Sequence, residues 1–278
     1  MGVQTQAPAG RPGWVTFLSD YGLSDGYVGV CHGVIAVMAP HTRVIDLCHD
    51  LDPGDLRRGS ALLAQSAPFL PAGVLLAVVE PAARPRRRGL VIAAGATYLV
   101  GPDNGLLWAA ARVLGGPRVA YEIKTAALLR QPVSSTFHGR DVFAPIAARL
   151  STGMDPSRVG PLVQVEDLVQ LPEPVSRLTA HRLEGEVLTV DRFGNVQTSL
   201  HMSLLVDGGL HEGDLLRLHC RTGEVCLPFG RTFADARPGE PVGYIDAAGM
   251  FALALDTDSA SVEYDLNPGD PVALRLGT

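Results

Sequence analysis

The chain carries little positive charge for its length. Lys124 is its only lysine, and 23 basic residues stand against 29 acidic ones, which gives a formal net charge of −6. Proteins that bind nucleic acids rely on clustered positive charge to neutralise phosphates. One basic cluster is present, in residues 78–89 (VVEPAARPRRRG), but it belongs to an acidic protein. We therefore expect no nucleic-acid partner.

Cysteine is also scarce. The four cysteines follow no regular spacing and no signal peptide precedes them, so we expect reduced thiols in a cytoplasmic protein. His219, Cys220 and Cys226 lie close together, but their spacing matches no common zinc pattern, and no metal is expected. No apolar run approaches the roughly 18–20 residues of a membrane span, so no membrane partner is expected.

A dinucleotide-binding glycine pattern is missing as well. Gly22, Gly26 and Gly29 do not have the G-x-G-x-x-G spacing, which disfavours a standard dinucleotide phosphate site. The chain is otherwise ordinary, with 46% hydrophobic and 19% charged residues. Its 278 residues are enough for two medium domains with cores of their own.

The first half alternates between two kinds of segment. Apolar runs predict strands, and segments with helical spacing lie between or after them. This alternation favours an α/β domain over residues 14–170, with a mostly parallel sheet covered by helices on both faces. The expected strands are residues 15–18, 44–47, 74–79, 90–93 and 98–100, and the expected helices are residues 27–38, 55–69, 105–114 and 141–150.

The second half has a different texture. Residues 171–178 include the proline-spaced stretch LPEPV and read as a linker, after which short β-like runs alternate with turns. No long helical segment follows, so residues 179–278 are predicted to form an all-β barrel. Residues 1–13, rich in Ala, Pro and Gly, are expected to be a flexible tail.

Acidic residues follow two of the expected strands. Ligands of open α/β sheets bind beyond the carboxyl ends of the strands, so these positions are candidates for function. Asp20 there suits hydrogen bonds from two ribose hydroxyls, whereas Asp25 is expected to serve as a turn or N-cap residue. Glu80 ends the third strand, and Arg87 is close enough in sequence to fold back onto it. From composition alone, this pair reads as an ordinary surface ion pair.

Two further stretches carry polar groups in turns. His138 lies in TFHGRDVFAP (residues 136–145), before a helix for which Asp141 is the expected N-cap. Asp191, Phe193 and Asn195 surround a glycine in VDRFGNVQT, where carboxylate, ring and amide suit the edge and face of a purine. Each stretch alone is equally consistent with a structural role.

Taken together and in this order, these stretches resemble the S-adenosyl-L-methionine hydroxide adenosyltransferase family, relatives of the fluorinases and chlorinases. The similarity runs from about Trp14 to Leu276. TFHGRD and DRFGN together, with GPDNG between an expected strand and an expected helix, form a specific combination, although each motif alone is weak. The matching stretches are FLSDYGLSDGYVG, residues 44–61, VGPDNGLL, TFHGRDVFAP, VDRFGN and TFADA.

The resemblance implies an N-terminal α/β domain, a C-terminal barrel and a homotrimer with active sites where subunits meet. It implies hydrolysis of S-adenosyl-L-methionine to adenosine and L-methionine without a cofactor. An Asp-Arg-His set around the attacking water corresponds here to Glu80, Arg87 and His138. The implied substrate-binding residues are Asp20 for ribose, Asp191 for the methionine ammonium group, Asn195 for adenine, and Phe193, Phe233 and Ala260.

The chain departs from this family in several places. Glu80 is one methylene longer than the family's aspartate, and Gly54 stands where relatives often carry an aromatic residue. Ala247 and Ala248 replace a polar pair. If the arginine-rich loop shifts register, Arg86 or Arg88 takes the role assigned to Arg87.

Two alternatives stay open. A halogenase acting at the same carbon is disfavoured because those relatives carry a long insertion after the strand-end acid and a tyrosine in place of His138. The other alternative is a protein that holds S-adenosyl-L-methionine or adenosine without turnover, and Glu80 and the two alanines keep it open.

Overall fold

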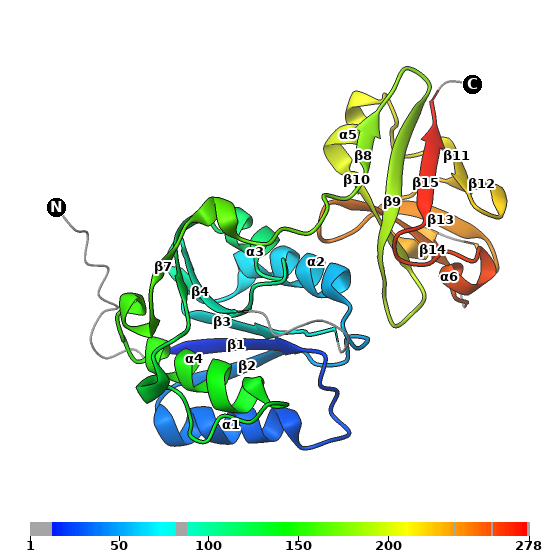
Figure 1. The fold of residues 1–278 in the computed structure, drawn as a ribbon. Helices are drawn as coiled ribbons and strands as arrows, with labels where there is room; N and C mark the ends of the chain where they lie inside the picture. The colour runs from blue at the N-terminus through cyan, green and yellow to red at the C-terminus, as the bar shows by residue number, and fades with distance from the viewer. Residues whose placement is uncertain (1–12, 82–87, 236, 257, 277–278) are drawn as a thin grey trace. The chain divides into compact units, whose positions relative to one another are not determined.

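The computed structural model describes residues 13–81, 88–235, 237–256 and 258–276. The chain divides into two compact units, one ending at Leu171 and the other beginning at Pro172 (Figure 1). Among the described residues, no helix is both long and apolar enough to cross a membrane. The α/β architecture and the C-terminal barrel predicted from the sequence are confirmed.

The N-terminal unit is built on a seven-stranded mixed sheet. Strand β1 pairs in parallel with β2 and β3, and β3 pairs in parallel with β5, whereas β4, β6 and β7 form antiparallel pairs. Strand β4 is antiparallel because two residues join it to β5, and so short a connection allows no crossover. In spatial order the strands are β2 (Arg43–Cys48), β1 (Trp14–Ser19), β3 (Val74–Val78), β5 (Thr97–Pro102), β4 (Gly89–Ala94), β6 (Pro117–Glu122) and β7 (Leu162–Val163).

Helices cover both faces of this sheet (Figure 1). Val15 and Phe17 of β1 pack with the buried side of α1 and α4, whereas Leu18 packs on the opposite face with α2 and α3. This alternation is what a strand buried on both faces requires. The helices are α1 (Tyr27–Met38), α2 (Leu56–Ser66), α3 (Trp108–Val113) and α4 (Ala144–Ser151), with short 3₁₀ turns η1 (Ala67–Phe69), η2 (Ala126–Leu128), η4 (Pro156–Val159) and η5 (Val165–Asp167).

One predicted helix start and two predicted caps were wrong. The last helix of the unit begins with a π-helical turn, η3 (Gly139–Phe143), whose N-cap is His138 and not Asp141. The Asp141 carboxylate lies inside that turn and accepts the Ser134 N–H at 2.8 Å, so it is not available to cap. For α1, the N-cap is Gly26 without a side-chain cap, and Asp25 does not fill that role.

The C-terminal unit is an antiparallel, nearly closed barrel. A bridge between Phe229 and Gly243 links the two ends of the strand order, and Leu183, Leu253 and Phe251 are among the side chains that fill the interior. The strands are β8 (Ser176–Leu178), β9 (Arg182–Val190), β10 (Val196–His201), β11 (Leu215–Cys220), β12 (Gly223–Pro228), β13 (Pro241–Ile245), β14 (Met250–Leu255) and β15 (Pro271–Arg275), with short helices α5 (Met202–Asp207), η6 (Phe233–Asp235) and α6 (Ala260–Glu263).

Candidate functional site

Asp20 joins three segments at the carboxyl ends of the parallel strands. It directly follows β1, and its Oδ2 accepts the backbone N–H of Gly54 at 2.9 Å and that of Glu80 at 3.3 Å. Gly54 has φ +78°, and a Cβ there would lie 2.9 Å from the Pro81 Cα. A larger residue at position 54 would therefore push this loop away from Pro81.

Glu80 and His138, 58 positions apart in the sequence, lie next to each other. The Glu80 Oε2 is 4.0 Å from the His138 Nδ1. The Glu80 side chain is 41% exposed, and its partial burial raises its pKa; His138 opposes this rise and the Asp20 charge adds to it. A carboxyl group with a raised pKa is suited to exchange a proton with a bound molecule.

The four arginines that follow Glu80 in the sequence divide into two groups. Arg87 lies outside the described residues, as do Arg84 and Arg86. Arg88 donates from Nε to Asp103 Oδ2 at 2.7 Å and from Nη2 to the Asp167 carbonyl at 2.8 Å. The Arg88 guanidinium is already paired with these two partners. This favours another arginine as the catalytic guanidinium that the resemblance implies beside Glu80.

Tyr21 is a neighbour of this site that the sequence reasoning missed. Burial raises its pKa, and the Cys31, Glu80 and Asp20 charges add to the rise, so the phenol stays neutral. A Cβ on Gly139 would come within 2.2 Å of the Tyr21 Oη. Glycine at position 139 therefore lets the turn after His138 approach the ring. In the sequence, only its position next to Asp20 pointed to Tyr21 as a neighbour of the site.

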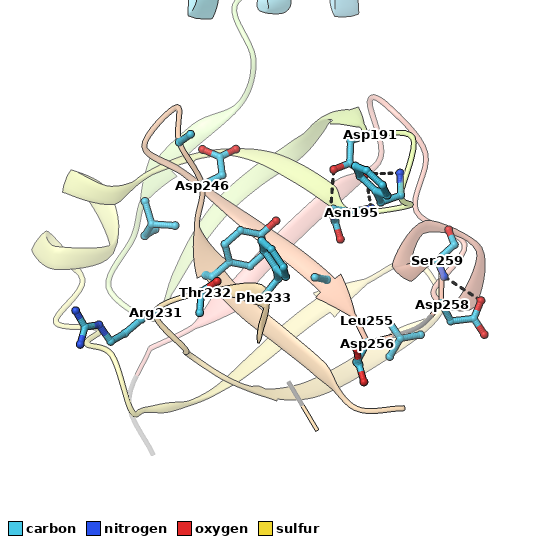
Figure 2. Close-up of a pocket in the computed structure, with 15 residues that line it drawn as sticks. Asp191, Asn195, Arg231, Thr232, Phe233, Asp246, Leu255, Asp256, Asp258 and Ser259 are labelled. Atoms are coloured by element: carbon cyan, nitrogen blue, oxygen red, sulfur yellow. Dashed lines mark hydrogen bonds between the residues drawn. The ribbon is translucent and has the colours of Figure 1, made fainter. Parts of the chain in front are cut away.

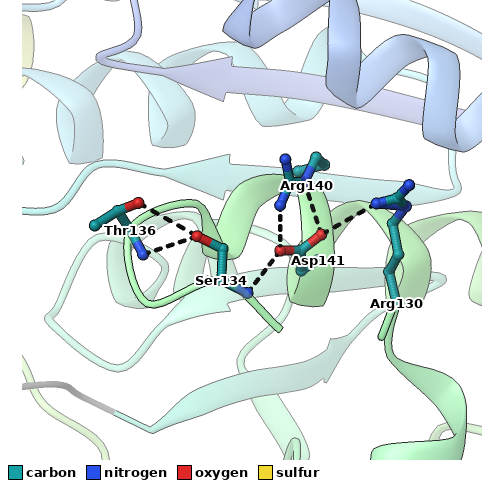
Figure 3. A network of polar contacts seen from close by, with 5 residues as sticks. All are labelled: Arg130, Ser134, Thr136, Arg140 and Asp141. Atoms are coloured by element: carbon teal, nitrogen blue, oxygen red, sulfur yellow. Dashed lines mark hydrogen bonds and ion pairs between the residues drawn. The ribbon is translucent and has the colours of Figure 1, made fainter. Parts of the chain in front are cut away.

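An ion-pair network anchors the loop that leads to His138 (Figure 3). The Asp141 side chain is fully buried and accepts two hydrogen bonds from Arg140, both at 2.7 Å. Its Oδ2 also accepts the Ser134 N–H, and Arg130 lies 3.7 Å from Oδ1. The hydrogen bonds from Arg140 are the main cause that lowers the pKa of Asp141. The network fixes the segment on either side of His138.

The barrel unit contains a pocket of about 900 Å³ (Figure 2). Two exposed rings line it, Phe193 and Phe233, and Phe233 contacts the Tyr244 ring edge-on at 6.2 Å between centroids. Exposed aromatic faces of this kind suit a planar ligand. Lining residues that the sequence reasoning did not single out are Arg231, Thr232, Tyr244, Ile245, Asp246, Ala254, Leu255, Asp256, Asp258 and Ser259.

One wall of the pocket is a hydrogen-bonded turn. The Asp191 Oδ1 accepts the backbone N–H groups of Phe193 at 2.8 Å and Asn195 at 2.9 Å, and its Oδ2 accepts the Asn195 Nδ2 at 2.8 Å. Gly194, with φ +85°, packs so closely on Ser259 that a Cβ would lie 2.2 Å from the Ser259 Oγ. These contacts hold the carboxylate, ring and amide in place before any ligand arrives.

The pocket is acidic. Among the described residues that line it, four are aspartates, Asp191, Asp246, Asp256 and Asp258, and one is an arginine, Arg231. Burial, followed by the Asp191 and Asp246 charges, raises the pKa of Tyr244 to about 12. A negative pocket with aromatic walls favours a cationic ligand that has a flat group.

The alanines that the resemblance singled out have different surroundings. Ala247 lines the pocket, and the Ala248 N–H donates to Asp246 Oδ1 at 2.8 Å. The Ala260 side chain is buried in the core of the barrel, and the neighbouring Ser259 is the one that lines the pocket.

The chain combines two features. Its α/β unit has polar groups at the strand ends, and its barrel has an acidic pocket with aromatic walls, so it belongs to a class of ligand-binding proteins built from these two units. A family model described as the SAM hydroxide adenosyltransferase N-terminal domain matches residues 15–160, and the C-terminal domain model of that name matches residues 185–273. The chain therefore belongs to the SAM hydroxide adenosyltransferase family.

Several relatives match over nearly their whole length. The chain is 46% identical to an (R)-S-adenosyl-L-methionine hydrolase of Salinispora tropica, covering 95% of this chain and 98% of the relative. It is 42% identical to a protein of the same name from Thermus thermophilus, covering 94% and 98%. A fluorinase of Nocardia brasiliensis is 28% identical, covering 96% and 98%.

A solved structure has the same fold. An uncharacterized conserved protein from Thermotoga maritima superimposes with a TM-score of 0.86 at 32% identity, covering 94% of this chain and 99% of that one. The family resemblance inferred from the motifs is thus confirmed over both units.

Proposed function

We propose that this protein hydrolyses S-adenosyl-L-methionine to adenosine and L-methionine. The near full-length identity of 42–46% to proteins named (R)-S-adenosyl-L-methionine hydrolase supports this reaction. That name also makes the epimer with R configuration at sulfur the proposed substrate. The observation that carries the proposal in the structure is the approach of the Glu80 carboxylate to the His138 imidazole, 4.0 Å apart beside Asp20.

In the proposed mechanism, water attacks C5′ of the ribose in line with the bond to sulfur. The C–O bond forms as the C–S bond breaks, its electron pair returns to sulfur, and neutral methionine leaves. A sulfonium is a good leaving group and needs no proton, so the difficult component is the weak nucleophile. Glu80 or His138 takes the water proton, and Arg87 stabilises the developing hydroxide.

The barrel pocket is the proposed holder of the rest of the substrate. Its four carboxylates suit the positive charges of the sulfonium and the α-ammonium group. We assign Asp191 to the ammonium group, Asn195 to the adenine edge, and Phe193 and Phe233 to the adenine face. We assign Asp20 to the ribose hydroxyls and propose that Ala260 lies near the bound substrate.

The proposed assembly is a homotrimer in which each site combines residues of two neighbouring subunits. Each unit described above carries only part of the proposed set: Glu80, His138 and Asp20 in one, and the acidic pocket in the other. We further propose that the protein needs no cofactor and acts in the cytoplasm.

The direct test is to incubate the purified protein separately with the R and S epimers at sulfur and to measure adenosine by chromatography. We expect adenosine from the R epimer. A 5′-halogenated nucleoside in the presence of chloride or fluoride would favour a halogenase instead. Intact ligand that remains bound, without adenosine after long incubation, would identify a binding protein.

A substitution in the arginine-rich loop tests the assigned guanidinium. Arg87→Ala is expected to abolish adenosine release while circular dichroism stays unchanged, because the developing hydroxide loses its positive partner. Arg84→Ala removes the same charge from the same stretch of sequence and is expected to keep normal turnover. Turnover of the Arg87 variant close to that of the wild type would remove Arg87 from the mechanism.

A further inference from the structure

Three potential metal ligands converge within the N-terminal unit, and the proposed reaction uses none of them. His32 comes from α1, Asp46 from β2, and His49 follows the end of β2. The Asp46 Oδ1 lies 2.8 Å from the His32 Nε2 and 3.0 Å from the His49 Nε2. The ligand atoms of all three residues lie within 4.8 Å of one another.

We propose that His32, Asp46 and His49 form a binding site for a divalent transition metal ion of the zinc class. Two imidazole nitrogens and one carboxylate oxygen are a donor set that binds zinc through three protein ligands, leaving a position for water. Imidazole ligands favour zinc, cobalt, nickel and copper over magnesium and calcium, which prefer oxygen.

A buried hydrogen bond already orients one of the imidazoles. The His49 Nδ1 lies 2.7 Å from the Ser19 Oγ, and both side chains are buried. The Phe17 ring packs edge-on against the same imidazole at 4.7 Å between centroids. These contacts direct the His49 Nε2 toward Asp46. Metal-binding histidines are commonly oriented by such a hydrogen bond from the nitrogen that does not bind the metal.

The other two ligands give an ion access from solvent. The side chain of His32 is 34% exposed and that of Asp46 is 46% exposed, whereas that of His49 is only 2% exposed. Without an ion, the Asp46 carboxylate pairs with both imidazoles. On binding, the metal takes the place of the Nε2 protons, and His49 keeps a proton on Nδ1 that it donates to Ser19.

Such an ion would add a crosslink between elements that already share the core of the N-terminal unit. It would tie α1 to the end of β2, and through His49 and Ser19 to the end of β1. A ligand that binds only the folded chain stabilises it by an amount that grows with the logarithm of the ligand concentration above its Kd. We therefore expect the ion to raise the unfolding temperature, whatever the substrate of the protein proves to be.

The test uses the full chain without a histidine tag, after treatment with a chelator. Titration with zinc chloride by calorimetry is expected to give one site with a Kd of about 10 µM or lower. Cobalt chloride is expected to produce visible absorption bands, and zinc is expected to remove them. An absence of binding by the folded wild-type chain overturns the proposal.

Variants locate the site. His32→Ala and Asp46→Ala change partly exposed side chains, and each is expected to weaken zinc binding about tenfold or more while circular dichroism is unchanged. His219→Ala is the matched control, because His219 also pairs with a carboxylate, that of Glu224, but in the barrel. Zinc affinity that is equal in the His32 variant and the wild type, or lost in the His219 variant, contradicts the assignment.

Discussion

At the residue scale, the environment of Glu80 disfavours its negative charge. Its partial burial is the main cause that raises its pKa, and the nearby Asp20 carboxylate adds to the effect. The backbone N–H of Glu80 donates to Asp20, so the two acidic residues are held close by the chain itself. A carboxylate in this state takes a proton more readily than an ordinary surface carboxylate.

A substitution of Glu80 tests whether its carboxylate accepts the proton of the attacking water. Glu80→Gln keeps the size of the side chain and removes its ability to accept a proton from water. We expect kcat for adenosine release to fall about 100-fold or more, with a smaller change in KM. Glu166→Gln, a change on the 3₁₀ turn η5, is the control and should leave turnover unchanged. A Glu80 variant with normal kcat would leave the proton transfer to His138.

The same substitution has an expected effect on stability. Because the pKa of Glu80 is raised in the folded state, its ionised form destabilises the fold at pH values above that pKa. Below the ordinary value of 4.5 the carboxyl is protonated in both states, and the penalty vanishes. Glu80→Gln should therefore unfold at an equal or higher temperature at pH 7, and this gain should disappear below pH 4.5. Thermal unfolding of the wild type and the variant between pH 7 and pH values below 4.5 measures this difference in unfolding temperature.

At the scale of elements, the turn between β9 and β10 depends on Gly194. A Cβ at this position meets Ser259, and φ is positive as well. Gly194→Ala is expected to cost about 2 kcal/mol or more and to raise KM, because the wall of the pocket must move. Gly209→Ala, with φ +72° and no atom near its Cβ, should cost only about 1 kcal/mol and leave KM unchanged. Equal effects of both variants on KM would contradict this.

The loop before η3 depends on Asp141. Its lowered pKa means that its contribution to stability is present above the ordinary value of 3.8 and is lost as the pH falls through the folded value. Asp141→Asn should cost about 2 kcal/mol at pH 7 and lower kcat through displacement of His138. The exposed Asp155→Asn, an N-cap change, should be nearly neutral. Thermal unfolding and kcat provide the two measurements, and an unchanged kcat would limit Asp141 to a structural role.

Elements with strong local patterns were predictable from the sequence. The helix expected at residues 27–38 is α1, and its buried residues Val28, Cys31 and Ile35 recur at helical spacing. The π-helical turn at Gly139 has no such pattern, since it depends on a buried carboxylate and on Tyr21 packing from a distant segment. The antiparallel direction of β4 was readable in principle from the short connection at Gly95.

The candidate site was less predictable than the fold. Asp20 was found because it ends a strand, and the position of ligands in open sheets follows from topology. The proximity of Glu80 to His138 has no local signal, and only the family resemblance brought the two together in advance. Tyr21 and Arg231 were missed because each matters through neighbours far away in the sequence.

At the scale of the whole molecule, the groups assigned to the reaction are divided between two compact units. The carboxylate and imidazole belong to the unit that ends at Leu171, and the acidic pocket belongs to the unit that begins at Pro172. Oligomers commonly build sites from residues of two subunits, and closed symmetry then repeats the site in every copy.

The last prediction tests that assembly by mixing two inactive variants. Glu80→Gln removes a group from the first unit and Asp191→Ala removes one from the second. If each site combines units of neighbouring subunits, trimers formed from an equal mixture, unfolded and refolded together, should regain about one quarter of wild-type turnover, because one site in four then has both intact halves. Each variant refolded alone is the control. Sites built within one chain would give no recovery, and sedimentation would report the oligomeric state independently.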